Sequence, residues 1–133
     1  RGRASHDARR ALGPPGGPIA RAVLTREGGL LGTRRLFGRS DRPTALVASS
    51  DMQAVGALRA LGELGLRVPE DVAVVSFDGT DEAAYASPQL TVVRQPVEQM
   101  AEEAVSRLIA PDPARGPHHA SFTPTLVVGR SCG

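Results

Sequence analysis

Two apolar runs separated by a helix-like segment constrain the fold of this chain most strongly. Residues 45–48 and 72–75 are almost wholly aliphatic and show no polar alternation. Between them, Ser50 and Asp51 can start a helix, and apolar residues recur at helical spacing as far as Gly65, where a C-cap belongs. Runs without alternation are typical of parallel strands that are buried on both faces. The segment 43–96 therefore predicts a strand–helix–strand unit.

Weaker patterns on both sides extend this unit into an alternating chain. Thr25 can cap a helix whose apolar face would use Leu30, Leu31, Leu36 and Phe37, although Gly28-Gly29 weakens that helix. The expected helices are 5–12, 25–37, 51–64, 81–86 and 97–108, and the expected strands are 19–24, 44–48, 72–76, 90–93 and 126–128. This order predicts an α/β fold, a doubly wound and mainly parallel sheet with a core of Ala, Leu and Val.

Charge and cysteine content narrow the class of protein. All 16 basic residues are Arg, and residues 1–42 hold ten of them against three acids, a balance of +7. Because these Arg lie among Gly and Pro with almost no aromatics, solvated arginine explains them better than a nucleic-acid surface. The single Cys132 excludes an internal disulfide. No run approaches the ~20 apolar residues of a membrane span, and the start lacks the apolar core of a signal peptide, so we expect a cytoplasmic protein.

No catalytic or metal-binding constellation emerges from the sequence. Residues 77–80 read FDGT and partly match the phosphatase motif D-x-D-G-T, but Ser76 stands where that chemistry needs a nucleophilic Asp. His118 and His119 form a pair in a loop without further ligands nearby. We therefore expect a protein that is not an enzyme and that needs no metal or cofactor.

Polar residues follow three of the predicted strands: Ser50, Asp78 and Gln95. At the carboxyl edge of a parallel sheet such residues meet, and small ligands bind there. A carboxylate there could accept two hydroxyl donors from a sugar or a ribose. Each residue also has a purely local explanation: Ser50-Asp51 as a helix cap, Asp78 as a cap of the Gly79 turn, and Gln95 as a partner of nearby backbone.

The stretch from Pro43 to Pro96 resembles the effector-binding region of lactose-repressor-type (LacI/GalR) transcriptional regulators. That family shows ND-x2-A-x-G-A-x2-A…GLRVPEDV-x-V-x-G-[FY]-DD…P-x-LTT-[VI]-x-QP, and this chain carries SDMQAVGALRA, GLRVPEDVAVVSFDG and PQLTVVRQP in the same order. The resemblance covers about residues 25–131. It implies a periplasmic-binding-protein-like type I core, of which residues 1–133 correspond to the C-terminal subdomain, with helix 96–109 crossing to an N-terminal subdomain. It also implies a DNA-binding headpiece, which these residues do not include.

The same resemblance implies ligand-binding roles for particular residues. Asp78 matches the first Asp of G-[FY]-D-D, and Gln95 matches the Gln of the final motif. Ser50 replaces the family's effector-binding Asn, Leu24 stands at a position that often holds a stacking aromatic, and Arg1 matches an effector-binding Arg after a two-residue gap. Because Leu cannot stack as Trp or Phe does, a purine ligand is less expected than a sugar.

The chain departs from the pattern at Ser76 and Gly79, where the family has Gly and a second Asp. The positions that the resemblance places at a dimer interface are Val55, Glu82, Tyr85 and Ala86.

The sequence thus predicts the effector-binding and dimerising part of a LacI-type repressor that senses a small molecule, a sugar or a sugar derivative. A periplasmic sugar-binding protein of a transport system remains the alternative. The helix 97–108 carries an apolar stripe that would pack on the other subdomain: Val97, Met100, Ala101, Ala104, Val105 and Leu108. We expect this helix to be displaced, to pack on a second chain, or to fold back onto the chain's own sheet.

Overall fold

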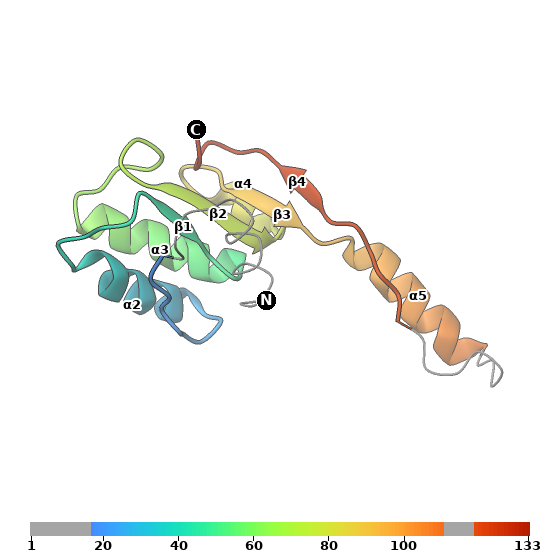
Figure 1. Cartoon of the computed structure of the whole chain (residues 1–133). Helices are drawn as coiled ribbons and strands as arrows, with labels where there is room; N and C mark the ends of the chain where they lie inside the picture. Colours follow the sequence, from blue (N-terminus) through green and yellow to red (C-terminus); the bar gives the residue numbers. More distant parts are fainter. Residues whose placement is uncertain (1–16, 111–118) are drawn as a thin grey trace.

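The computed structural model describes residues 17–110 and 119–133, in which helices and strands alternate (Figure 1). The elements are α2 (Arg26–Phe37), β1 (Ala45–Val47), α3 (Asp51–Glu63), β2 (Ala73–Asp78), α4 (Asp81–Tyr85), β3 (Thr91–Arg94), α5 (Val97–Ile109) and β4 (Thr125–Val127). The helix predicted over residues 5–12 lies outside the described residues. The other predicted helices are confirmed to within a few residues at their ends.

The four strands form one sheet in the order β1-β2-β3-β4. β1, β2 and β3 are parallel, and the register places Val75 opposite both Val47 and Thr91. β4 pairs with β3 in the antiparallel direction. The carboxyl ends of three parallel strands therefore meet at one edge of the sheet, as the predicted α/β fold requires.

Helices α2 and α3 pack closely because glycines face their partner's backbone. A Cβ on Gly29 would lie 2.0 Å from the carbonyl oxygen of Gln53, and one on Gly56 would lie 1.9 Å from that of Arg26. The glycines that weakened the prediction of α2 are thus what lets it approach α3. The predicted leucine face is wrong in part, since Leu31 is 42% exposed while the glycines are buried.

Local signals at both ends of α3 behave as predicted. The Ser50 hydroxyl accepts a hydrogen bond from the Gln53 amide at 3.2 Å and so caps the helix. Beyond the other end, Gly65 has φ +72°, and the Leu66 amide donates to the Leu61 carbonyl at 2.9 Å. This is a Schellman closure, for which Gly65 is suited because a left-handed φ costs glycine little.

The predicted strand 19–24 is wrong. Residues 17–23 form no strand, and the Ile19 and Val23 side chains are 62% and 74% exposed. The segment's backbone bonds to α3 instead of to a neighbouring strand: the Gln53 side-chain amide donates to the Val23 carbonyl at 2.8 Å. Thr25 then caps α2 through a bond from the Gly28 amide.

Burial along β2 alternates, which corrects the prediction that both faces are fully buried. Val74 and Ser76 are buried, whereas Ala73, Val75 and Phe77 are only partly so. One face of the sheet therefore carries the core of the described residues, with these apolar members: Phe37, Ala48, Ala54, Leu61, Val72, Val74, Ala83, Leu90 and Val92. The predicted Ala, Leu and Val core is confirmed, with Phe37 as its one aromatic.

Helix α5 extends away from the body formed by the sheet and the other helices (Figure 1). None of its residues is buried, and Val97, Met100, Val105 and Leu108 are 60%, 40%, 50% and 81% exposed. Of the arrangements predicted for this helix, folding back onto the chain's own sheet is wrong. Its apolar stripe stays open in the single chain.

Ser131 closes the opposite end of the sheet. Its side chain is fully buried, and its hydroxyl donates to the Val74 carbonyl at 2.6 Å and accepts from the Thr91 amide at 2.8 Å. Its own carbonyl accepts from the Val74 amide at 2.6 Å. Ser131 thus joins β2 and β3 at their amino ends, although it follows β4 in the sequence.

Candidate functional site

Asp78 and Gln95 lie side by side at the carboxyl edge of the sheet. Asp78 ends β2, and Gln95 directly follows β3. The Gln95 amide donates to the Asp78 carbonyl at 3.0 Å, and Gln95 Nε2 donates to Asp78 Oδ1 at 2.6 Å. Both residues are half-buried, so the pair is anchored and still reachable from solvent. The structure therefore brings together two of the predicted site residues.

The backbone around Asp78 adopts a conformation that side-chain-bearing residues rarely take. Asp78 has φ +127°, and Gly79 follows with φ +80°. At Gly79 there is also no room for a side chain, because a Cβ would lie 2.8 Å from Arg94 Cα. Strain of this kind persists only where surrounding contacts hold it. The glycine in place of the family's second Asp is therefore a requirement of this loop.

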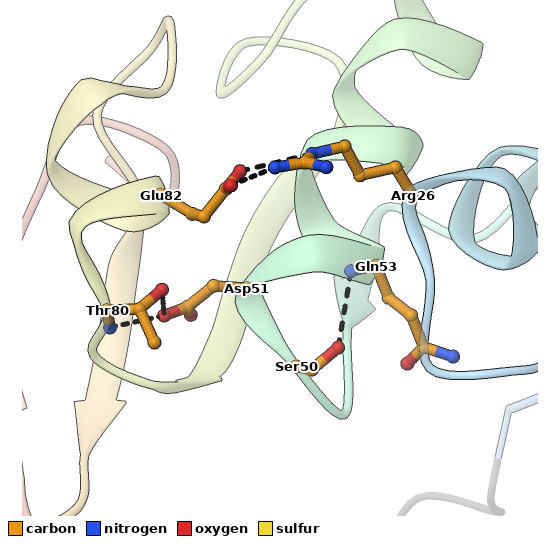
Figure 2. A network of polar contacts seen from close by, with 6 residues as sticks. All are labelled: Arg26, Ser50, Asp51, Gln53, Thr80 and Glu82. Atoms are coloured by element: carbon orange, nitrogen blue, oxygen red, sulfur yellow. Dashed lines mark hydrogen bonds and ion pairs between the residues drawn. The ribbon is translucent and has the colours of Figure 1, made fainter.

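Those contacts come from Asp51, in the first turn of α3. Its buried carboxylate accepts from the Gly79 amide at 2.9 Å, and from the Thr80 amide and hydroxyl at 2.7 and 2.9 Å, all at Oδ2. Oδ1 accepts from the Ser76 hydroxyl at 2.6 Å. Figure 2 shows the carboxylate reaching from α3 to Thr80, at the start of α4. The sequence predicts Asp51 mainly as a cap of its own helix, and nothing in the local pattern indicates this role.

The remaining predicted ligand residues are placed less centrally. Ser50 is 7% exposed and serves as the N-cap of α3, which is the local role weighed for it (Figure 2). Leu24 is 54% exposed and lies just before the cap of α2, outside the sheet. Arg1 lies outside the described residues. Of the predicted ligand residues that the structure describes, Asp78 and Gln95 are thus the two that contact each other directly.

A hollow of about 480 Å³ lies between α3 and α4. Its lining residues are Val55, Thr80, Asp81, Glu82, Tyr85 and Ala86. All four residues predicted for a dimer interface are in that set. The Tyr85 side chain is 88% exposed, and Glu82 forms an ion pair with Arg26 of α2 (Figure 2). We call this set the α4 face; an exposed tyrosine over a hollow is typical of a contact surface.

The described ranges, 17–110 and 119–133, contain neither a candidate metal site nor a candidate membrane span. No group of three or more His, Cys, Asp or Glu side chains is placed to hold a metal ion there. In the same ranges, no helix has the length and hydropathy needed to cross a membrane.

Similarity to known proteins identifies the family of this chain. Residues 2–132 match the family described as the periplasmic binding protein-like domain. The transcriptional regulator MalR of Streptomyces coelicolor is 42% identical over 112 residues, which cover 83% of this chain and 32% of that regulator. The chain thus spans about a third of the length of such relatives.

Solved structures agree with this match. An uncharacterized protein from Actinobacillus succinogenes superposes with a TM-score of 0.90 at 35% identity, over 98% of this chain and 50% of that one. The transcriptional regulator CelR in complex with cellobiose gives a TM-score of 0.78 at 31% identity, over 95% of this chain and 40% of that one. The resemblance to LacI-type regulators is confirmed at the level of sequence relatives and fold.

Proposed function

Because this chain belongs to the family of periplasmic binding protein-like domains, we propose that it is the effector-binding and dimerising part of a LacI-type transcriptional regulator. Its relatives are regulators rather than enzymes or transport proteins, which favours this function over the alternative of a periplasmic sugar-binding protein. The same relatives support a cytoplasmic location.

The observation that carries the proposal is the hydrogen-bonded Asp78–Gln95 pair at the carboxyl edge of the sheet. A carboxylate can accept two hydroxyl donors, and a side-chain amide both donates and accepts. This chemistry suits the vicinal hydroxyls of a sugar. The complex of a related regulator with cellobiose supports the same ligand class.

The proposed arrangement assigns a place to the open stripe of α5. We take residues 1–133 as the C-terminal subdomain and α5 as the helix that crosses to the N-terminal one, so that its apolar stripe packs there and the effector lies between the two. Operator DNA is bound through a separate headpiece. Effector binding then changes DNA affinity by favouring one arrangement of the subdomains.

The α4 face is proposed as the surface through which two copies associate. It combines a hollow, an exposed tyrosine and the small side chain of Ala86, all of which suit a self-complementary contact.

Titration calorimetry of the full-length protein with cellobiose, sucrose and maltose, beside its Asp78→Asn variant, tests the effector site. The expected result is that one of these sugars, or a close derivative found by extending the set, binds the native protein and binds the variant more weakly. Equal affinity for both proteins would contradict the assignment of Asp78.

A further inference from the structure

We propose that Asp51 is the positioning residue of this domain: its carboxylate holds the loop 78–80, and so sets the place of both Asp78 and helix α4. The part that concerns effector binding rests on the function proposed above. The part that concerns the loop and α4 rests on the described contacts alone.

Asp51 accepts several hydrogen bonds from residues 76–80. Four donors converge on one carboxylate that is 1% exposed: the Ser76 hydroxyl, the Gly79 amide, and the Thr80 amide and hydroxyl. A carboxylate acts as an acceptor through both of its oxygens, which suits it to receive all four donors. These donors lie on both sides of Asp78, whose φ of +127° needs such support.

Helix α4 has only five residues, and Asp51 contacts its start. Thr80 is its N-cap residue, yet the Thr80 side chain makes no cap bond to its own helix and donates to Asp51 instead. The Thr80 carbonyl in turn accepts from the Ala83 amide at 3.1 Å. Figure 2 shows the Asp51–Thr80 contact and the Arg26–Glu82 ion pair as two bridges to this helix. Because Arg26 is 58% exposed in its side chain, the buried Asp51 bridge is the stronger of the two.

The Asp51 carboxylate also accounts for the serine at position 76, where the family pattern has a glycine. Ser76 is 1% exposed and has its hydroxyl 2.6 Å from Asp51 Oδ1. A glycine would leave that oxygen without this donor. Ser76 therefore acts together with Asp51, and substitutions at the two positions should have non-additive effects.

The coupling gives a sharp mutational test. In Asp51→Asn, the amide oxygen has two lone pairs for the three donors that Oδ2 now accepts, so it can keep most of these bonds, while the amide NH2 donates to the Ser76 hydroxyl, which can also accept. This variant should largely keep the loop in place. Asp51→Ala loses all four bonds and should release the loop. The double variant D51N/S76A leaves the new NH2 buried without its acceptor, which should turn the amide toward water, break its bonds to residues 79 and 80, and so release the loop as well.

Hydrogen exchange of the full-length protein at the amides of Gly79, Thr80 and Ala83 decides the proposal. Relative to the native protein, we expect exchange at these amides to rise about 10-fold or more in Asp51→Ala and in D51N/S76A, and much less in Asp51→Asn. The matched control is Ser50→Ala, which removes the cap of the same helix but none of the bonds to the loop. It should lower overall stability without selective exchange at these amides.

The proposal is overturned if exchange at the three amides is unchanged in D51N/S76A, or if Ser50→Ala raises it equally. The double variant keeps the test valid if Asp51→Ala does not fold. Sugar titration and sedimentation of the same variants separate the positioning role of Asp51 from the proposed effector function. If exchange rises as expected while the native protein binds none of the sugars, the positioning role stands and the effector function fails. If the native protein binds a sugar and exchange does not change in the variants, the effector function stands and the positioning role fails.

Discussion

Gln95 donates its side-chain amide to Asp78 Oδ1 across 2.6 Å, which ties the ends of β2 and β3 together at the sheet edge. The bond fixes the orientation of the Asp78 carboxylate at this edge. An amide at position 78 would present a donor where an acceptor is needed. We therefore expect Asp78→Asn to weaken effector binding by about 1–3 kcal/mol, or roughly 5- to 150-fold in Kd, in calorimetry of the full-length protein.

A control for that loss is Asp81→Asn, which changes a carboxylate of α4 just beyond the loop. It should leave effector affinity within about twofold. An equal loss in both variants would point to a general charge effect instead of a contact by Asp78.

Tyr85 is the residue of the α4 face whose removal should most weaken self-association. Its ring is 88% exposed in the single chain and lines the hollow between α3 and α4. Tyr85→Ser should raise the dimer dissociation constant by roughly 10- to 100-fold, because buried aromatic anchors carry much of an interface's energy. Sedimentation equilibrium measures this. Val23→Ser, at another exposed apolar position, should have no such effect, and a dimer that tolerates Tyr85→Ser unchanged would exclude the α4 face.

The open stripe of α5 should make the isolated 133-residue chain associate at high concentration. Leu108 is its most exposed member, at 81%. Leu108→Glu should reduce concentration-dependent light scattering, since a charge in the stripe opposes its burial against another molecule. Ser106→Glu adds the same charge to an exposed position outside the stripe. If both variants lower the scattering equally, net charge and not the stripe governs association.

Glycines in α3 should respond to alanine in opposite directions. At Gly56 a Cβ would lie 1.9 Å from the Arg26 carbonyl oxygen, so Gly56→Ala must push α2 away and should cost about 1–3 kcal/mol or more of unfolding free energy. At Gly62 no atom beyond the neighbouring residues and backbone of the helix itself lies within 4 Å of the added carbon. Gly62→Ala should therefore stabilise the helix by about 0.5–1 kcal/mol. Urea unfolding of both variants compares them directly, and a stabilising Gly56→Ala would contradict the packing described.

Asp71 should contribute to stability only above strongly acidic pH. The Arg67 side chain, and then the Arg67 backbone amide, donate to its carboxylate and lower its pKa from the ordinary 3.8 to about 2. Because the folded pKa lies below the unfolded one, the stabilisation is complete above about pH 4 and is lost as the pH falls toward 2.

Asp71→Asn should remove this dependence, whereas Arg67→Gln should only reduce it, because the Arg67 backbone amide still donates to Asp71. The double variant should remove no more than Asp71→Asn alone. Unfolding free energies measured between pH 2 and 5 test this. A stability difference between the native chain and Asp71→Asn that stays constant over that range would show that the ion pair does not act as described.

The parts of the fold that could be predicted are those set by residues close in sequence. Helix α3 carries its own start at Ser50 and its own stop at Gly65, and both act as expected. Asp78 and Gln95 were predictable as neighbours because each follows a strand, and parallel strands end at a common edge. The hydrogen bond from the Gln95 backbone amide to the Asp78 carbonyl follows from that register.

The parts that could not be predicted depend on partners far along the chain. The segment 19–24 has the composition of a strand, but its carbonyl groups bond to Gln53, 30 residues beyond Val23. Asp51 likewise looks like a simple cap, and only the fold brings it donors from 25 to 29 residues away. Periodicity and capping rules describe residues that are close in sequence, so they cannot predict such contacts.

Ser131 has a consequence for the order in which the chain can fold during synthesis. Val74 and Ser131 are 57 residues apart, and they exchange bonds in both directions. When β2 has left the ribosome, the backbone groups of Val74 must remain bound to water until residue 131 follows. The sheet is thus completed at its amino end only after residue 131 has been made, because a contact between distant residues cannot form before both are present.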